Sequence, residues 1–582
     1  MTLRSTRKSK SLRPPGVRSV GCGGGWYGRN ERALYRRKDA YSGKDIISIY
    51  SPEKPFRVYD QKIWWSDAWD STSYGKDYDF SQPFFKQFGT LLQAVPVMAL
   101  QNIESVNSDY CSNCSRNKDC YMVSAGFTNE KVFYANRALY CKDSLDFYLG
   151  EELELSYGNV NCSQGFRLFF SNDSENCRES YFLWGCKNCS YCFGCVNLYN
   201  KSYYIFNEPY SREEYERTLK EFGLDSFAEF QRVVERFETH RVRFPYRFAK
   251  FIHSYDVTGD NVRGSKNCIY CFNVFSDAEN CKFVEWSGYG LKDAYDVEGV
   301  GDHTALLYEN VMTERLSRAY FVTAVNDSHD VAYSFYCFSC HNLFGCIGLR
   351  KKQYCILNRQ YTKEEYEKLA PRIIAHMNEM PYVDSRGRIY RYGEFFPPEL
   401  SPFAYNETIA QEYFPATKEQ ALEQGYGWRD PEERHYEITL SADQIPDHIK
   451  DVPDSILNEI IQCAHSLFGG LTSKQGRNEQ CTTAFKIIPQ ELEFYRKMNL
   501  PLPRRCPNCR HYQRLKQRNP LKLWHRQCTC AGSTSDNEVY RNTASHPSHS
   551  ANQHCPNEFE TSYSPERKEI VYCEQCYQAE VV

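Results

Sequence analysis

Nine cysteines near the C-terminus have the residue type and spacing of metal ligands. Two Cys-x-x-Cys pairs stand out, Cys506 with Cys509 and Cys573 with Cys576. A zinc ion takes four thiolate or imidazole ligands in a tetrahedron, and one such turn supplies two of them. The candidate ligands are Cys463, Cys481, Cys506, Cys509, Cys528, Cys530, Cys555, Cys573 and Cys576. Nine thiols suffice for two Zn²⁺ ions, which we expect to stabilise a segment with little core of its own.

The preferred assignment groups Cys463 and Cys481 with the first Cys-x-x-Cys pair. The second pair would take Cys555 and either Cys528 or Cys530. Spacing alone leaves an interleaved pairing of the two Cys-x-x-Cys turns open. Histidine also binds zinc, so nearby imidazoles could replace thiols, and these are His465, His511, His525, His546, His549 and His554.

The same region is basic and contains aromatic side chains. Residues 504–528 hold eight Lys or Arg and no acidic residue. Cations follow a phosphate backbone, and exposed aromatic rings stack on the bases of single strands. The candidate nucleic-acid-binding residues are Arg504, Arg505, Arg510, Arg514, Lys516, Arg518, Lys522, Trp524 and Arg526. The alternatives are a basic surface that docks on acidic residues of this chain and a surface that contacts protein partners.

No catalytic motif accompanies these residues. The sequence contains no His-Glu-x-x-His helix, no phosphate-binding glycine loop and no serine-nucleophile elbow. We therefore expect a non-catalytic scaffold that binds RNA, single strands or a ribonucleoprotein, with a protein-interaction scaffold as the alternative. A thiol or zinc enzyme is the less favoured third class, because Cys-x-x-Cys can be redox-active and an open zinc site can be catalytic.

A repeat with a period of twelve precedes the basic region. In steps of twelve the chain places Tyr121, Phe133, Leu145, Tyr157, Phe169, Tyr181 and Phe193. A fixed short period indicates one unit stacked on copies of itself. A stretch of this length suffices for two short strands and two turns, so the period predicts a narrow β-solenoid.

The array is duplicated further along the chain. A shift of 151 residues aligns Cys186 and Cys195 with Cys337 and Cys346 without a gap. Both copies end in a capping-box spacing, Ser211 with Glu214 and Thr362 with Glu365, which predicts a closing helix for each. In the second copy the aromatic residues are eleven to thirteen positions apart instead of twelve, which predicts local bulges. We interpret the array cysteines as packing residues. The exception is the run from Cys186 to Cys195, whose four sulfurs at three-residue spacing could converge on one ion.

Length and charge narrow the class of protein. A chain of 582 residues is too long for one hydrophobic core, so we expect several. Its 71 basic and 74 acidic residues nearly balance, so the net charge indicates no particular class of binding partner. No apolar stretch approaches the roughly 20 residues of a membrane span, and no secretory signal is visible, so we expect a cytoplasmic protein with no membrane partner. Its 27 cysteines are then expected to stay reduced.

These patterns predict a mainly β fold with helical inserts, in which duplicated short-coil β-solenoid-like arrays precede C-terminal zinc-ribbon-like modules. The predicted segments are a basic, disordered segment 1–28, an N-terminal cap 29–103, a first array with capping helix 104–224, a helical connector 225–254, a second array with capping helix 255–377, a hairpin and loop-rich connector 378–454, and a zinc-ribbon-like domain 455–582.

Several runs resemble those of a known family. They are residues 485–495 (FKIIPQELEFY), the Leu500-Pro-Leu-Pro run before Cys506, residues 518–524 (RNPLKLW), and the Cys573 knuckle. The chain resembles an uncharacterised family of cysteine-rich zinc-ribbon proteins from candidate-phylum bacteria with small genomes, over nearly everything after Arg29. The resemblance implies zinc binding and a shared architecture, and it implies no particular reaction.

Overall fold

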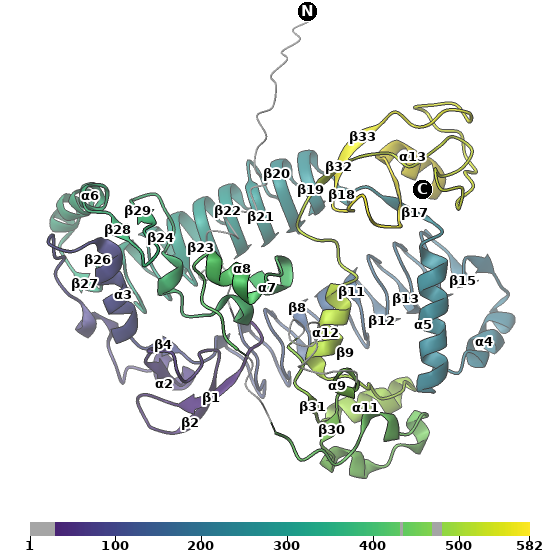
Figure 1. Ribbon diagram of the computed structural model, residues 1–582, viewed down its shortest axis with the longest axis horizontal. Coiled ribbons are helices and arrows are strands. Elements are labelled where there is room, and N and C mark those ends of the chain that lie inside the picture. The colour runs from purple at the N-terminus through teal and green to yellow at the C-terminus, as the bar shows by residue number, and fades with distance from the viewer. Residues whose placement is uncertain (1–29, 431–434, 468–479) are drawn as a thin grey trace, which may run out of the picture.

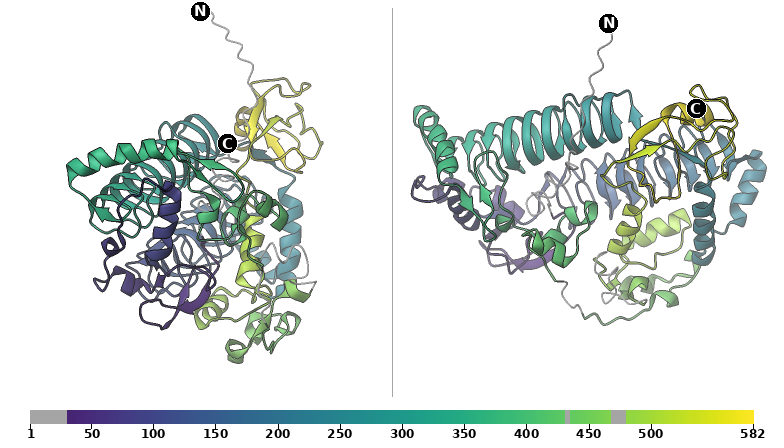
Figure 2. Two further views of the ribbon diagram at one scale, coloured as in Figure 1. Left: turned by 60° about the vertical axis from the view of Figure 1, so that its left-hand side comes forward. Right: turned by 45° about the horizontal axis from the view of Figure 1, so that its top comes forward.

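The computed structural model describes residues 30–430, 435–467 and 480–582. The predicted segment 1–28 lies outside the described residues. Two β-solenoid arrays lie side by side, as the views in Figures 1 and 2 agree. The first array runs toward α4 and α5, and the second runs back toward α6 at the opposite end of the molecule (Figure 1). None of the helices in the described part is both long and apolar enough to span a bilayer.

The first array consists of short parallel strands in a register of twelve, so that Tyr148 pairs with Val160 and Leu168 with Ser180. Its strands are β5 (Asn102–Ile103), β6 (Cys114–Ser115), β7 (Glu130–Phe133), β8 (Asn136–Leu139), β9 (Lys142–Leu145), β10 (Tyr148–Glu151), β11 (Val160–Ser163), β12 (Phe166–Phe169), β13 (Arg178–Tyr181), β14 (Ser190–Phe193) and β15 (Ser202–Ile205), followed by the antiparallel β16 (Glu208–Pro209). The predicted solenoid with its period of twelve is confirmed.

Each coil of this array has four sides of three residues rather than the expected two strands and two turns. A left-handed residue with positive φ recurs at every third position, as at Asp119, Met122, Ala125 and Thr128, before the next coil repeats the pattern at Lys131. A corner after every three residues leaves too little chain for two longer strands. The pattern therefore makes a narrow four-cornered coil.

Small side chains fill the inside of these coils. The inward position is also every third residue, and it holds Cys111, Cys114, Cys120, Cys141 and Cys162, all of them at most 2% exposed. Their thiols donate to main-chain carbonyls, and their burial raises the pKa of Cys141 and Cys162 to about 12. Cys186, Cys189, Cys192 and Cys195 are buried in the same way and donate to carbonyls two residues earlier.

The aromatic column points outward from the coils and is covered by other parts of the chain. Phe133, Leu145 and Phe169 are buried against residues from the region 440–510. Further along the column, Phe193 stacks on Phe222 with ring centroids 4.3 Å apart. The aromatic column is thus a docking surface for the C-terminal region and for the closing helices.

The second array has wider coils near its start. Tyr295 pairs with Tyr308, thirteen positions later, whereas later pairs such as Glu314 with Asn326 return to a spacing of twelve. A bulge lies between Val257 and Gly259, in agreement with the predicted irregularity. The strands are β18 (Phe251–Ile252), β19 (Tyr255–Arg263), β20 (Lys266–Val274), β21 (Lys282–Ser287), β22 (Lys292–Gly301), β23 (Ala305–Thr323), β24 (Asn326–Ala332), β25 (His341–Phe344), β26 (Gln353–Ile356) and the antiparallel β27 (Arg359–Gln360).

Helices follow both arrays. Ser211 and Glu214 form the predicted capping box of α4 (Arg212–Glu221), and Thr362 and Glu365 form that of α6 (Lys363–Glu379). The long helix α5 (Phe227–Arg241) lies beside the end of the first array and packs Phe237 into it. Tyr215 of α4 is buried with its ring 5.7 Å from that of Tyr203 in β15, and Tyr366 of α6 lies 5.9 Å from Tyr354 in β26, so each closing helix covers the last coil of its array.

The N-terminal cap packs on the second array. Its elements are β1 (Tyr35–Lys38), β2 (Asp45–Ser48), β3 (Val58–Tyr59), α2 (Gln61–Trp65), η1 (Ser71–Tyr74), α3 (Phe84–Ala94) and β4 (Val97–Met98). Trp64 is fully buried and its ring lies 5.8 Å from that of Phe338 in the second array.

The connector after α6 begins with the hairpin of β28 (Tyr382–Val383) and β29 (Ile389–Tyr390). It continues through short helices, which are η2 (Pro398–Leu400), η3 (Tyr405–Glu407), α7 (Ala410–Tyr413), α8 (Lys418–Glu423), η4 (Ala442–Gln444), η5 (Ile449–Asp451) and η6 (Asp454–Asn458). Two C-terminal modules complete the chain. The first contains β30 (Ile461–Gln462), α9 (Ala464–Leu467), β31 (Ala484–Phe485), α11 (Pro489–Met498) and α12 (Pro507–Leu515), and the second contains β32 (Trp524–Gln527), β33 (Glu558–Thr561), β34 (Ile570–Tyr572) and α13 (Glu574–Val581).

Candidate metal centres and the cavity between the arrays

Cluster 1 consists of Cys463, Cys481, Cys506 and Cys509, whose buried sulfur atoms lie within 4.8 Å of one another. The preferred first assignment thus corresponds to four side chains that the fold brings together. The sulfur atoms of Cys463 and Cys509 are 3.9 Å apart. A zinc–sulfur bond of about 2.3 Å requires tetrahedral edges of about 3.8 Å, so the cluster has room for one zinc ion.

Local elements position the ligands of cluster 1. Cys506 is the N-cap of α12 and Cys509 lies in its first turn, while Cys463 follows β30. The main-chain N–H of Cys506 donates to the sulfur of Cys463 at 3.2 Å, which stabilises a thiolate. Hydrogen bonds from neighbouring thiols, with Cys463 the strongest donor, hold the pKa of Cys506 well below its usual value.

Cluster 2 consists of Cys528, Cys555, Cys573 and Cys576, again with all ligand atoms within 4.8 Å. The sulfur of Cys555 lies 3.8 Å from that of Cys573 and 3.6 Å from that of Cys576. The main-chain N–H of Cys573 donates to the sulfur of Cys528 at 3.2 Å. Of the two residues that spacing left open, Cys528 joins this cluster.

A third group gathers around Cys530. Its sulfur, the imidazoles of His546 and His549, and the sulfur of Cys576 also lie within 4.8 Å of one another. From the sequence, these histidines are expected only as substitutes for thiols. Their spacing, His546-Pro-Ser-His549, is the signal that could have identified them as a pair of ligands on one turn.

Four further histidines were possible substitutes for thiols. Two of them lie away from the cysteine clusters, and two lie beside a cluster cysteine. His511 is buried with its Nε2 3.0 Å from Glu412, and His525 lies at the surface between Glu558 and Glu560. His465 places Nδ1 3.3 Å from the sulfur of Cys509, at the edge of cluster 1. The ring of His554 lies beside the carbonyl of Cys555.

Several of the arginines predicted to bind nucleic acid are buried and paired within the chain. Arg510 lies 3.0 Å from Asp146 of the first array and donates to Glu491 at 2.9 Å. Arg514 lies 3.1 Å from the other oxygen of Asp146. Both guanidinium groups are thus used in docking α12 on the first array, so they do not face solvent as a phosphate-binding surface would require.

The remaining basic residues divide between the interior and the surface. Arg504 is buried and donates to the carbonyl of Ile445, and Arg518 donates to the hydroxyl of Tyr148. Arg526 is half-buried and donates to the carbonyl of Ser564. Arg505 is partly buried, Lys516 and Lys522 are exposed, and the ammonium of Lys522 lies 4.8 Å from the ring centre of the half-buried Trp524.

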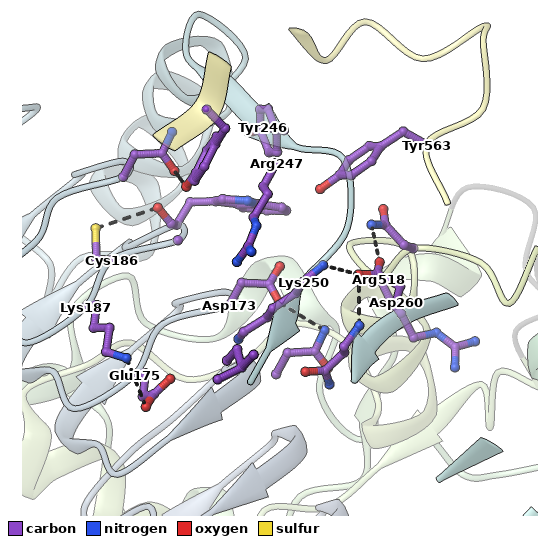
Figure 3. Close-up of a pocket in the computed structure, with 18 of the residues that line it drawn as sticks. Asp173, Glu175, Cys186, Lys187, Tyr246, Arg247, Lys250, Asp260, Arg518 and Tyr563 are labelled. Carbon is purple, nitrogen blue, oxygen red and sulfur yellow. Dashed lines mark hydrogen bonds and ion pairs between the residues drawn. The ribbon is translucent and has the colours of Figure 1, made fainter. Parts of the chain in front are cut away.

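A cavity of about 260 Å³ lies where the two arrays meet the C-terminal modules (Figure 3). Asp173 and Glu175 line it from the first array, Lys250 and Asp260 from the start of the second, and Arg518 from the C-terminal region. Burial raises the pKa of Asp173 and lowers that of Lys250.

Most charges around the cavity already have partners. Arg247 donates to both carboxylate oxygens of Glu574, at 2.6 and 2.7 Å, and Asp260 accepts from Asn519 and Ser562. Glu175 lies 3.5 Å from Lys187. The cavity is therefore bordered by ion pairs and hydrogen bonds that join the arrays to the second C-terminal module.

Comparisons with known proteins identify no family. No protein-family model matches the chain, and no curated protein matches it significantly. Among solved structures, a "putative acetyltransferase" from Desulfovibrio desulfuricans is similar at 9% identity over 49% of this chain and 84% of that chain, with a TM-score of 0.10. A UDP-N-acetylglucosamine acyltransferase from Campylobacter jejuni is similar at 8% identity over 48% and 90%, with a TM-score of 0.08. Scores this low carry no argument about activity.

Proposed function

We propose that this protein is a non-catalytic scaffold in which zinc-bound C-terminal modules hold two solenoid arrays in a fixed arrangement. Four buried thiolates are a donor set that suits zinc, and the family resemblance of the sequence implies the same ion. Four protein ligands per ion leave no open position for a substrate, which favours a structural role over a thiol or zinc enzyme.

The observation that carries the proposal is the position of each cluster next to a docking element. Cys506 and Cys509 of cluster 1 begin α12, and the same helix places Arg510 and Arg514 against Asp146.

Cluster 2 is joined to the arrays in a similar way. Cys573 directly follows β34, which pairs in parallel with β17 (Pro245–Arg247) between the two arrays. The next residue, Glu574, binds Arg247. A metal ion that orders either cluster would therefore order the contacts that fix the arrays.

An exposed row of side chains on the second array supports a role in presenting a surface to a protein partner. Ile269, Lys282, Tyr295 and Tyr308 are paired in register on successive coils. Ile269, Tyr295 and Tyr308 are between 36% and 45% exposed, and the ammonium of Lys282 lies 5.4 Å from the ring centre of Tyr295. Neighbouring exposed aromatic side chains such as Tyr295 and Tyr308 are typical of a contact surface.

Binding of RNA or single strands is the second candidate, and it depends on the basic residues that stay at the surface. Lys516 and Lys522 are exposed, and Trp524 lies beside Lys522. Cations next to an aromatic ring are the arrangement that single-strand binding uses.

The test of the scaffold is metal removal from the full chain, followed by hydrogen exchange of α12 and of β17. We expect both segments to lose protection when the metal is removed and to regain it with zinc. The variant Asp146→Asn, with metal bound, is expected to expose α12 and to leave β17 protected. Unchanged exchange in the metal-free protein would overturn the proposal.

The nucleic-acid candidate needs its own comparison. Lys516→Glu with Lys522→Glu reverses two exposed charges, and Lys486→Glu with Lys497→Glu is the control with the same change of net charge. Only the first pair should weaken binding of a single-stranded oligonucleotide and flatten its salt dependence. Equal effects of both pairs, or co-purification of protein partners that survives nuclease, would favour the protein-interaction scaffold.

A further inference from the structure

Cys576 belongs to two groups of candidate ligands at once. One is cluster 2, and the other contains Cys530, His546 and His549. We propose that the second C-terminal module holds two metal ions bridged by the thiolate of Cys576, one ion bound by the four thiols of cluster 2 and the other by the second group. The inference deepens the proposed function, on whose metal binding it rests.

The distances in the second group fit a tetrahedral ion. The sulfur of Cys530 lies 3.1 Å from Nδ1 of His546 and 3.4 Å from Nε2 of His549. Nε2 of His549 lies 3.3 Å from the sulfur of Cys576, and the two ring nitrogens are 3.1 Å apart. Zinc bonds of about 2.3 Å to sulfur and about 2.0–2.1 Å to nitrogen give edges of about 3.3 Å between two nitrogens and about 3.6 Å between nitrogen and sulfur, so a small outward adjustment would admit the ion.

The surroundings orient His546 as a ligand. Its Nε2 donates to Glu580 at 2.8 Å, and the two side chains are 1% and 0% exposed. That hydrogen bond leaves Nδ1 unprotonated and facing Cys530. A carboxylate behind a histidine in this way is the usual second partner of a metal-bound imidazole.

The carboxylate of Glu580 is itself fixed in place. It accepts from the main-chain N–H groups of Thr543 and Ala544 at 2.9 and 3.0 Å. Asn542 donates to the sulfur of Cys530 at 3.2 Å, which stabilises the thiolate form of that ligand. The second group is therefore supported by a surrounding layer of hydrogen bonds.

Charge favours the second ion. One zinc ion with four thiolates carries a formal charge of minus two, and a buried charge needs compensation. Adding Cys530 as a thiolate, two neutral imidazoles and a second zinc ion brings the total to minus one. Sharing Cys576 gives each ion four ligands from only seven side chains.

The test is the metal content of the zinc-loaded full chain, together with the cadmium-113 NMR spectrum of the same chain after its zinc has been replaced by that isotope. We expect three ions per chain, one in cluster 1 and two in the bridged centre. Two of the three cadmium signals should show coupling to each other through the shared sulfur, and the third should show none.

Variants separate this inference from the proposed function. His549→Ala should lower the content from three ions to two and abolish the coupling, whereas the surface variant His525→Ala should keep three. Two ions in the unmodified chain, or three without coupling, would overturn the bridged centre and leave the zinc-stabilised scaffold intact. Fewer than two ions would contradict both.

Discussion

Arg137 of the first array donates to both carboxylate oxygens of Glu285 in the second, at 2.5 and 3.1 Å. The guanidinium is fully buried, also reaches Glu298 at 3.2 Å, and lies 4.6 Å from the ring centre of Trp286. The two arrays, which are built from separate stretches of chain, are thus joined through one buried cation.

Replacing that cation should destabilise the pair of arrays. Arg137→Gln would leave Glu285 and Glu298 without their buried partner, and breaking a buried pair in this way costs roughly 3–5 kcal/mol. Denaturant unfolding would measure the loss. Arg116→Gln, which removes an exposed cation from Glu104 in the same array, is the control and should cost under about 1 kcal/mol. Equal losses would show that Arg137 does not join the arrays.

The bulge at Gly259 should tolerate no side chain. Its φ is +135°, and a Cβ there would lie 1.7 Å from the carbonyl oxygen of Cys271 on the next coil. We expect Gly259→Ala to cost at least about 2 kcal/mol, because the backbone of two coils must separate. Gly43→Ala has a positive φ with nothing within 4 Å and serves as the comparison. If the two variants have the same melting temperature, the close approach of the coils is not present in solution.

His240 should make stability depend on pH. Burial, followed by Arg243 and Arg236, lowers the pKa of His240 to about 4 from an ordinary value of 6.5. The unfolded chain therefore binds a proton at this site between pH 6.5 and 4 while the folded chain does not, so the free energy of unfolding should fall as pH drops through that window. His240→Gln should flatten this part of the profile in denaturant titrations at pH 7 and pH 5. A variant with the full slope would assign the effect to another group.

The array thiols should resist alkylation. Burial raises the pKa of Cys141 and Cys162 to about 12, so neither has appreciable thiolate at pH 8. Iodoacetamide mapping by mass spectrometry should find both unmodified in the native protein and modified in denaturant. Rapid native labelling would mean that the coils open.

The sequence predicted the solenoid because its docking surface repeats with the coil. Phe133 and Phe169 belong to one column with a period of twelve, since successive coils present a large side chain on the same face, where other segments cover it. The three-residue sides were missed, although the inward series Cys111, Cys114, Cys120 contains their period. Side chains of very different size, among them Cys, Asn and Gly, occupy the inward positions and hide that period.

The sequence predicts the membership of a metal cluster only where the spacing between cysteines restricts which of them can share an ion. A tight Cys-x-x-Cys turn brings Cys506 and Cys509 together locally. The choice between Cys528 and Cys530 depends instead on the course of the chain from Thr529 to Cys555, which no spacing rule describes. The prediction that Arg510 and Arg514 lie at the surface was wrong for a related reason. Their partner Asp146 is far away in the sequence, so the sequence gives no sign that these arginines are paired and buried.

The corners of the second array bear on how such a chain can lengthen. Its wider coils place Asp277, Gly290 and His303 one above another at a spacing of thirteen, each with positive φ. Successive residues with positive φ are usually three positions apart, but Asn273 and Asp277 are four positions apart. This wider corner lies beside the column. One insertion that no bulge or wider corner absorbs would turn the later inward side chains outward. Small insertions are therefore tolerated at irregular positions such as this column and the bulge at Gly259, and other growth comes by copying whole coils.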